Sequence, residues 1–231
     1  MVKYLLFDCM ETLVDLHDWQ GADEDARWAF EGSGLERLWE SFAQFSAEYH
    51  DAKHNLDDQF HDREYPLSDR FGLMARRKFP TESTAFQDGV ITRLQENFWQ
   101  TYRSHCYVRP DVQRVLGKLQ ATYKLGVVSN FKVPGGVEEL LTTNGIGHFF
   151  DFVISSINVG YRKPSPEIYR MALDRIGTPP SAVCFIGDDL RNDYLVPKAL
   201  GMKTMLLDRY QRHLEIPERV ADFAAILPYL F

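Results

Sequence analysis

The chain is poor in cysteine, and the few cysteines have no spacing that suggests a structural task. Its 231 residues include three, Cys9, Cys106 and Cys184, which lie far apart and form no Cys-x-x-Cys pair. An odd number at such spacing argues against a disulfide framework and against a zinc site. Because disulfides persist mainly in oxidising compartments, this usage favours a reduced, cytoplasmic setting.

The sequence also lacks an excess of positive charge. Lys and Arg number 26 against 33 Asp and Glu, which gives a net charge of −7 and an isoelectric point near 5.5. Proteins that bind nucleic acids usually carry a basic patch, so no nucleic-acid partner is expected. An anionic small molecule is compatible with this balance, because the local field of a site can differ from the total charge.

Long apolar runs and low-complexity segments are missing as well. No stretch approaches the roughly 18 apolar residues of a membrane span, so no membrane partner is expected. The N-terminal segment is strand-like and does not have the charged and apolar regions of a secretory signal. Proline, glycine and glutamine are not concentrated anywhere, and 45% of the residues are hydrophobic, which predicts an ordered core.

The first segment predicts a buried strand that ends at a carboxylate. Residues Tyr4–Phe7 form a short apolar run, and Asp8 follows directly. Such a run is typical of a strand in a parallel sheet, and open α/β sheets bind their ligands at the carboxyl ends of strands. At that position Asp8 can act as a metal ligand, a general base or a nucleophile, or it can simply cap the next turn.

From about Leu16 to Cys106 the sequence is rich in helix formers and aromatic residues. Apolar residues recur at spacings of three and four from Leu35 to Tyr49, which predicts one helix. Ser33 and Glu36 have the spacing of a capping box for its start. Two further helical segments are predicted, at 71–79 and at 90–102. The region is therefore interpreted as a mainly helical insert.

After residue 107, strands and helices alternate at short intervals. The predicted strands are 124–131, 149–155, 182–186 and 203–207, and the predicted helices are 110–119, 136–143, 166–176 and 193–200. Residues 220–231 predict a short strand and a final helical turn. This alternation is typical of a parallel sheet with helices on both faces. We predict an α/β fold with a doubly wound, Rossmann-like core of residues 1–15 and 107–231, interrupted by a helical domain of residues 16–106.

Polar residues follow four of the predicted strands or lie in the loops just beyond them. They are Asp8; Ser129 and Asn130; Lys163; and Asp188, Asp189 and Asp193. Each taken alone has an ordinary explanation as a turn residue, a solvated lysine or a helix cap. One open sheet brings all four strand ends to the same edge. We therefore expect carboxylates, an ammonium group and a hydroxyl to share one site.

That combination of groups suits phosphoryl transfer. Asp8 and Asp188 can bind a hard divalent cation such as Mg²⁺, which accepts a few carboxylates together with waters and a phosphate oxygen. Ser129 and Lys163 can bind the transferring oxygens. Attack by Asp8 on phosphorus would give an aspartyl phosphate, which water then hydrolyses.

Four motifs in the expected order resemble those of the haloacid dehalogenase superfamily. They are Phe7-Asp8-Cys9-Met10-Glu11-Thr12-Leu13; Val127-Val128-Ser129-Asn130; Arg162-Lys163-Pro164 with the helix that follows; and Ile186-Gly187-Asp188-Asp189 through Asp193, followed by Ala199-Leu200-Gly201-Met202. The resemblance covers the whole chain. It implies that the insert is a helical cap of the first type.

The resemblance also assigns roles to individual residues. Asp8 is implied to be the nucleophile, while Ser129, Asn130 and Lys163 are implied to bind the phosphoryl group. The implied Mg²⁺ ligands are Asp8, the main-chain carbonyl of Met10, Asp188 and Asp193. A small phosphorylated substrate and a monomer or homodimer are expected.

The sequence departs from the family pattern at Met10 and Glu11. Phosphatases of this family usually carry a second Asp at the position of Met10, which protonates the leaving oxygen and then activates water. Methionine cannot do general acid–base chemistry. At the next position Glu11 replaces the family's usual Gly. Glu11 could substitute for the missing acid, although its backbone position would aim its side chain differently.

Three interpretations follow from this departure. The protein hydrolyses a phosphorylated compound that needs no protein acid, such as an acyl phosphate or phosphonate, or it takes an acid from the insert. Alternatively, it is a dehalogenase in which Asp8 attacks carbon, although Asp188, Asp189 and Asp193 favour a metal site. As a third interpretation, it is a weakly active or inactive relative that binds a ligand or partner.

The candidates for an acid supplied by the insert are His50, Lys53, His54 and His61. The favoured explanation for these polar residues is that they form a solvated face of a helix.

The aromatic residues of the insert allow two interpretations. They are Trp19, Trp28, Trp39, Phe42, Phe45 and Trp99. Some of them can line a substrate pocket, but large aromatic side chains are most often buried in a core. We therefore expect most of them to form the core of the insert.

Overall fold

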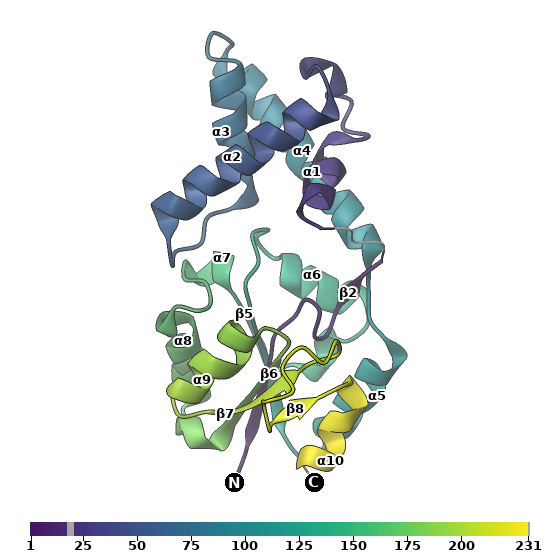
Figure 1. Ribbon diagram of the computed structural model, residues 1–231, viewed down its shortest axis with the longest axis vertical. Helices are drawn as coiled ribbons and strands as arrows, with labels where there is room; N and C mark the ends of the chain where they lie inside the picture. Colours follow the sequence, from purple (N-terminus) through teal and green to yellow (C-terminus); the bar gives the residue numbers. More distant parts are fainter. Residues whose placement is uncertain (18–20, 231) are drawn as a thin grey trace. The chain divides into compact units, whose positions relative to one another are not determined.

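The computed structural model describes residues 1–17 and 21–230, and its ribbon is shown in Figure 1. The chain divides into two compact units. One consists of Met1–Asp15 together with Tyr107–Phe231, and the other is Leu16–Cys106. We call them the sheet unit and the helical unit, and each is described by itself.

Among its described residues, the sheet unit contains six parallel strands. They are β1 (Tyr4–Phe7), β4 (Lys124–Ser129), β5 (Phe152–Ser155), β6 (Val183–Gly187), β7 (Lys203–Leu207) and β8 (Arg219–Val220), in the spatial order β5-β4-β1-β6-β7-β8. Strand β1 lies between β4 and β6, and its residues Leu5, Leu6 and Phe7 are fully buried. This position explains why β1 is an unbroken apolar run with no alternation of polar residues. The predicted parallel sheet is confirmed.

Helices cover both faces of this sheet, as the alternating pattern predicted. The helices of the unit are α5 (Pro110–Leu119), α6 (Gly136–Thr143), α7 (Ser156–Val159), α8 (Pro166–Ile176), α9 (Val196–Ala199) and α10 (Ile226–Leu230). On one face Leu6 and Phe185 pack in a buried cluster with Tyr169 of α8. On the other face the ring of Phe7 contacts that of Phe223, with centroids 5.9 Å apart.

One predicted helix of the sheet unit begins elsewhere than expected. The sequence pattern predicted a helix at 193–200, with a capping role as the ordinary explanation for Asp193. The structure instead has a π-helical segment, Leu190–Leu195, which runs into α9. Asp189 caps it by accepting a hydrogen bond from Asn192 N at 2.7 Å. This shift leaves the Asp193 side chain available for the site, and π-helical turns often occur at functional positions.

The described residues of the helical unit, 16–17 and 21–106, form four helices and a short 3₁₀ turn. The helices are α1 (Ala22–Phe30), α2 (Phe42–Phe60), α3 (Leu67–Lys78) and α4 (Thr84–His105), and the 3₁₀ turn is Glu36–Leu38. Two-residue strands β2 (Asp15–Leu16) and β3 (Cys106–Tyr107) pair where the chain passes from one unit to the other. The described part of this unit is thus mainly helical.

The prediction of one helix starting near Ser33 was wrong. Helix α2 begins at Phe42, and its cap is Ser41, whose hydroxyl accepts a hydrogen bond from Gln44 N at 3.2 Å. Ser33 accepts one from Leu35 N instead, inside a turn where Gly34 has a φ of 75°. A second Ser-x-x-Gln pair thus competes with the first, and the left-handed glycine prevents the helix from starting earlier.

The aromatic residues of the insert mostly form its core. Trp28 and Trp39 are each 5% exposed, and Phe45 is fully buried. The rings of Phe30 and Trp39 both lie 4.9 Å from that of Phe45. The prediction that such residues form the core of the insert is therefore confirmed for Trp28, Trp39 and Phe45, while Trp19 lies outside the described residues.

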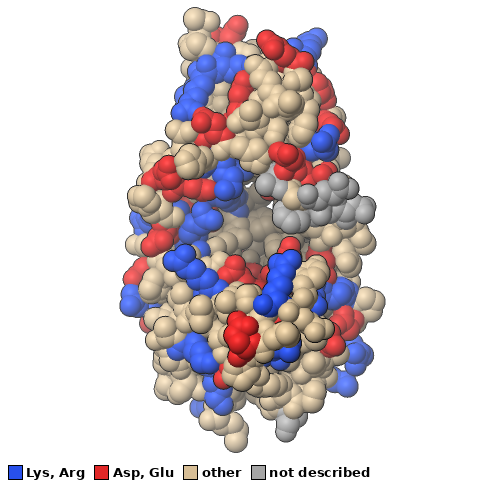
Figure 2. Space-filling view, viewed as in Figure 1, with Lys and Arg blue, Asp and Glu red and all other residues tan. Residues whose placement is uncertain are grey.

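The charged residues are mixed on the face shown in Figure 2. Lys and Arg alternate there with Asp and Glu, and among the described residues of this face neither sign forms a continuous field. In the part of the chain that the structure describes, no helix is long and apolar enough to cross a membrane.

Candidate active site

The ends of β1 and β6 place two carboxylates beside each other. Asp8 follows β1 and donates its main-chain N–H to Ile186 O at 3.0 Å, so it continues the strand pairing by one residue. Phe7 is in register with Ile186, and Asp188 comes immediately after β6. Ser129, which is 1% exposed, is the last residue of β4 on the opposite side of β1. These sequence-predicted residues therefore meet at one edge of the sheet.

Lys163 connects the nucleophile candidate with a second buried acid. Its Nζ lies 2.8 Å from Asp8 Oδ1 and 2.7 Å from Asp193 Oδ1, and its side chain is only 2% exposed. Asn130 fixes the main chain at this point, because its Oδ1 accepts from Lys163 N at 2.6 Å and its Nδ2 donates to Lys163 O at 2.8 Å. Asn130, predicted to contact substrate, thus supports Lys163.

Asp193 is fully buried and has partners for both carboxylate oxygens. Oδ1 accepts from Lys163, while Oδ2 accepts from Asp189 N at 3.1 Å. The main chain of Gly187 passes directly against it, and a Cβ at that position would lie 2.3 Å from Asp193 Oδ2. Only glycine at position 187 therefore leaves room for the carboxylate that holds Lys163.

Three carboxylates form a group that fits a hard divalent cation. Asp8, Asp188 and Asp193 each offer one oxygen, and these oxygens all lie within 4.8 Å of one another. Asp8 Oδ1 is buried and, apart from its ion pair with Lys163, has no hydrogen-bond partner among the described residues. Such an oxygen-only set matches the preference of Mg²⁺. Because both oxygens of Asp193 are engaged, the freer ligands are Asp8 and Asp188.

The electrostatics of the group also suit a cation. Burial, reinforced by the charges of Asp8, Asp193 and Glu11, raises the pKa of Asp188 to about 8. Burial raises the pKa of Asp193 too, although Lys163 opposes that shift. For Lys163 burial alone would lower the pKa, but Asp193 and Asp8 outweigh it and raise the pKa above its usual value. One ammonium among three carboxylates, of which Asp193 is fully buried, leaves negative charge that a divalent ion would offset.

The loop after β1 contributes the hydroxyl of Thr12 to the site, a group that the sequence motifs did not indicate. Thr12, which is fully buried, donates its hydroxyl to Asp188 Oδ1 at 3.1 Å. The adjacent Glu11 has a φ of 56°, a left-handed conformation that suits glycine far better than other residues. The family's usual glycine at this position would have been the available signal for that geometry. Met10, which precedes it, brings no titratable group into the loop.

The acid candidates of the insert have local partners in the helical unit. His50, Lys53 and His54 all belong to α2 and pair with carboxylates of the same unit. The partners are Asp23 at 2.8 Å, Asp57 at 2.9 Å and Asp58 at 3.3 Å, respectively. His61 directly follows the last residue of α2, with a φ of 49°. These contacts favour the explanation as a solvated helix face.

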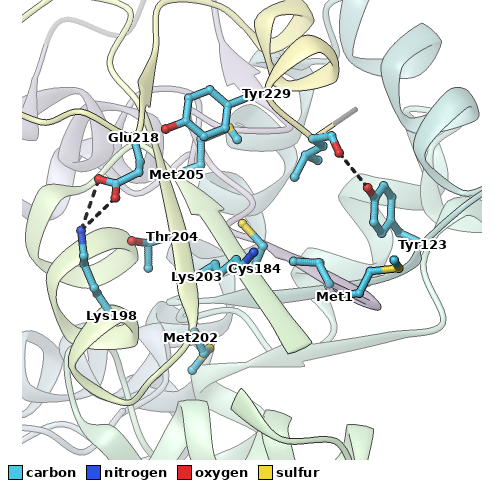
Figure 3. Close-up of a pocket in the computed structure, with 12 residues that line it drawn as sticks. Met1, Tyr123, Cys184, Lys198, Met202, Lys203, Thr204, Met205, Glu218 and Tyr229 are labelled. Atoms are coloured by element: carbon cyan, nitrogen blue, oxygen red, sulfur yellow. Dashed lines mark hydrogen bonds and ion pairs between the residues drawn. The ribbon is translucent and has the colours of Figure 1, made fainter. Parts of the chain in front are cut away.

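A separate cavity lies at the amino ends of the strands. Figure 3 shows it, and its volume is about 500 Å³. Met1, Val2 and Lys203 line it where β1 and β7 begin, so it contains none of the sequence-predicted site residues. Cys184 also lines it, and burial raises the pKa of this thiol to about 12. Cys9, Cys106 and Cys184 are buried thiols with no disulfide between them.

The comparison with known families agrees with this geometry. The haloacid dehalogenase-like hydrolase family matches residues 2–201, and the chain therefore belongs to this family of hydrolases. The resemblance noted in the motifs is therefore confirmed.

Curated relatives are similar over part of the chain. Haloacid dehalogenase-like hydrolase domain-containing protein 3 of Danio rerio is 39% identical over 97 residues, which cover 41% of this chain and 39% of the relative. Pyrophosphatase PpaX of Bacillus velezensis is 40% identical over 85 residues, covering 37% and 38%. Pyrimidine 5'-nucleotidase YjjG of Escherichia coli is 30% identical over 131 residues, covering 56% of each chain. The chain thus spans between about two fifths and just over half of these relatives.

Solved structures share the fold over the whole chain. A 2-haloacid dehalogenase from Pseudomonas syringae pv. Tomato superposes with a TM-score of 0.75 at 18% identity, covering 100% of this chain and 98% of that chain. A predicted phosphoglycolate phosphatase from Haemophilus somnus has a TM-score of 0.67 at 19% identity, with the same coverage. At such low sequence identity these similar structures establish the fold only, and the reaction must be inferred from the residues of the site.

Proposed function

We propose that the protein is a magnesium-dependent phosphohydrolase that acts on a small phosphorylated compound through an aspartyl phosphate on Asp8. The observation that carries the proposal is the Asp8–Lys163–Asp193 ion-pair chain with Asp188 beside it. This arrangement combines a mostly covered carboxylate nucleophile, whose side chain is 14% exposed, with a fixed cation and an oxygen-only metal site. Phosphoryl transfer through an aspartyl phosphate uses those three elements, because its catalysis depends mainly on positioning and charge stabilisation.

Each group has a defined task in the proposed reaction. A carboxylate oxygen of Asp8 attacks phosphorus, the bond from phosphorus to the leaving oxygen breaks, and water later attacks the phosphorus of the aspartyl phosphate to release phosphate. Lys163 and Ser129 bind the phosphoryl oxygens, while Asp193 keeps Lys163 in place and charged. Mg²⁺, held by Asp8, Asp188 and the Met10 carbonyl, would neutralise phosphate charge.

The side chain of Met10 restricts the leaving group. The leaving group of a phosphate monoester is an alkoxide, which a general acid helps by protonating it. The leaving group of an acyl phosphate is a carboxylate, which needs no proton. We therefore propose that activated phosphates, such as acyl phosphates, are the preferred substrate class. The helical unit, residues 16–106, is interpreted as a cap that would select among activated phosphates. Relatives named pyrophosphatase and nucleotidase support a phosphorylated substrate.

Dehalogenation is the second candidate, and Met10 is the observation that favours it. A dehalogenase needs no acid at this position, because a halide leaves carbon without protonation. The grouping of Asp188 and Asp193 with Asp8 favours the phosphohydrolase, because an oxygen-only set of carboxylates suits Mg²⁺, which halide displacement does not require. The two candidates therefore differ in their dependence on metal.

The test compares three substrates with and without Mg²⁺: an acyl phosphate, a simple phosphate monoester and 2-chloropropionate. We expect magnesium-dependent phosphate release, faster from the acyl phosphate than from the monoester. Asp8→Asn should lower turnover by on the order of 10⁴-fold or more, as in other enzymes that lose their nucleophile. Phosphate and chloride release would be followed, and circular dichroism would verify that the variant is folded.

The matched control is Asp151→Asn, which removes an exposed carboxylate paired with Lys124 at 3.6 Å. It should leave turnover unchanged. Metal-independent chloride release would replace the proposal with dehalogenation, and undiminished turnover in Asp8→Asn would remove the nucleophile assignment.

A further inference from the structure

A charged cluster outside the catalytic group joins three distant parts of the sheet unit. Asp15 lies between two arginines: Oδ1 accepts from Arg209 Nη1 at 2.8 Å, and Oδ2 is ion-paired with Arg109 Nη1. Asp15 is 7% exposed. Asp15 precedes the helical insert, Arg109 follows it, and Arg209 lies just beyond β7. We call these three residues the arginine clamp.

The clamp binds the main chain of the loop that follows the nucleophile. Arg209 Nη2 donates to the carbonyl oxygen of Glu11. The carbonyl oxygen of Thr12 lies 3.4 Å from an Nη2 atom of each arginine. Guanidinium groups are planar and present several donors in a fixed fork, so one arginine can hold a carboxylate and a carbonyl together. The clamp therefore fixes two consecutive peptide groups.

Those two peptide groups carry residues that matter to the candidate metal site. Thr12 donates its hydroxyl to Asp188 Oδ1 at 3.1 Å, and the carbonyl group of Met10, a proposed metal ligand, joins directly to Glu11 N. Glu11 N itself donates to Val14 O at 2.8 Å. Rotation of the Glu11 backbone would therefore move both the Met10 carbonyl and the Thr12 hydroxyl.

The backbone at Glu11 needs such support because it is strained. Its φ of 56° lies in the left-handed region, which glycine adopts freely and a residue with a Cβ resists. Such conformations persist only when the surrounding structure over-determines them. Here the hydrogen bonds to the Glu11 carbonyl from Arg209 and from Glu11 N to Val14 O supply that constraint.

We propose that Arg209, held by Asp15, is a positioning residue that keeps residues 10–12 in the conformation the metal site requires. This inference rests on the proposed function in so far as the site binds Mg²⁺. Arg209 touches neither substrate nor metal in this scheme; it acts through the Glu11 and Thr12 carbonyls. Groups that orient metal ligands in this way typically contribute 10- to 100-fold to metal affinity or activity.

The test uses the full chain with Arg209→Gln, Arg209→Lys and Asp15→Asn. Mn²⁺ serves as the probe of the metal site in calorimetric titrations, because it accepts the same oxygen ligands as Mg²⁺. Hydrogen exchange of the amides in residues 9–15 reports the loop directly, and kcat and KM are measured with the substrate that the wild type turns over best. The control is Arg212→Gln, since that guanidinium stacks on the exposed ring of Tyr210, 4.9 Å from its centroid.

We expect Arg209→Gln to weaken Mn²⁺ binding by about 10- to 100-fold and to lower kcat more than it changes KM. Exchange should accelerate in residues 9–15 while strand β4 stays protected. Arg209→Lys should recover only part of the loss, because an ammonium cannot span Asp15 and the Glu11 carbonyl. Asp15→Asn should act in the same direction even if Arg209→Gln does not fold.

Unchanged exchange and Mn²⁺ affinity in Arg209→Gln would overturn the proposal, and so would an equal loss in Arg212→Gln. Failure of the proposed function looks different, since the wild type itself would then show no Asp8-dependent phosphate release. In that case exchange and Mn²⁺ affinity alone decide whether the clamp positions the loop.

Discussion

At the scale of single residues, Lys163 balances most of the buried charge in the site. It is the shared partner of Asp8 and Asp193, and Asp193 has no exposure to water. Burying a carboxylate without a counter-ion is costly, whereas a neutral amide of the same shape is tolerated better. The stability of the sheet unit should therefore depend on this pair acting together.

The corresponding prediction is that Lys163→Met lowers the free energy of unfolding by about 3–5 kcal/mol, because it leaves Asp193 buried and uncompensated. Adding Asp193→Asn to that variant should restore part of the loss, with a coupling of about 1–3 kcal/mol between the two positions. Denaturant unfolding of the wild type, both single variants and the double variant would measure it. If the single losses simply add, the two groups do not share one interaction.

Individual residues of the site also differ in whether the sequence motifs indicated them. The residue types at Asp8, Lys163 and Asp188 indicated their site because a carboxylate or ammonium at a strand end has few other uses once several coincide. Thr12 and Arg209 were not indicated, because a threonine and a surface-type arginine are common everywhere. Their roles depend on contacts across 176 and 198 positions of the sequence, to Asp188 and to the Glu11 carbonyl, which no local pattern contains.

At the scale of elements, β4 and β5 pack too closely to admit a side chain at Gly126. A Cβ there would lie 2.6 Å from the ring of Phe152, which is itself mostly buried on the neighbouring strand. The strand therefore tolerates glycine despite its poor strand propensity, because the aromatic ring fills the space.

We predict that Gly126→Ala destabilises the protein by about 1–3 kcal/mol, the usual effect of overpacking. Gly117→Ala is the matched control: its Cβ in α5 would be an ordinary 3.8 Å from Phe149, and alanine is favoured over glycine in helices by up to about 1 kcal/mol. Thermal unfolding should move in opposite directions for the two variants. Equal behaviour would mean that the Phe152 ring shifts without cost.

Elements with strong local signals were predicted well. The bounds of β1, β7, α6 and α8 match the expectations, because apolar runs and terminal glycine or proline residues mark their ends. Boundaries failed where two local signals competed, as at the start of α2, or where the backbone departed from α-helical geometry, as at Leu190–Leu195. In both cases tertiary packing selected between local alternatives.

At the scale of the whole molecule, metal binding should contribute to stability. Mg²⁺ would relieve the mutual repulsion of Asp8, Asp188 and Asp193, and a ligand that binds only the folded state stabilises it by mass action. A concentration of 100 times the dissociation constant corresponds to about 2.7 kcal/mol.

We therefore predict that Mg²⁺ raises the unfolding temperature of the wild type and that EDTA reverses the effect. Asp188→Asn should largely abolish the shift. Asp189→Asn is the control, because an asparagine still caps the π-helical segment by accepting from Asn192 N, and the shift should persist. Differential scanning calorimetry would measure both, and a full shift in Asp188→Asn would exclude that residue as a ligand.

The sequence by itself determined the succession of strands and helices along the chain and the parallel sheet. It also determined which carboxylates and which lysine lie at one edge of that sheet. It could do so because apolar periodicity specifies which face of each element is buried, and because parallel topology sends every carboxyl end to the same side. Only the tertiary structure decided how that set is connected. In the folded protein Lys163 forms hydrogen bonds with Asp193 and with Asn130. Thr12 donates a hydrogen bond to Asp188, and Arg209 donates one to the Glu11 carbonyl oxygen. Such contacts depend on ångström-scale distances between segments far apart in the chain, and those distances arise only when the core is packed.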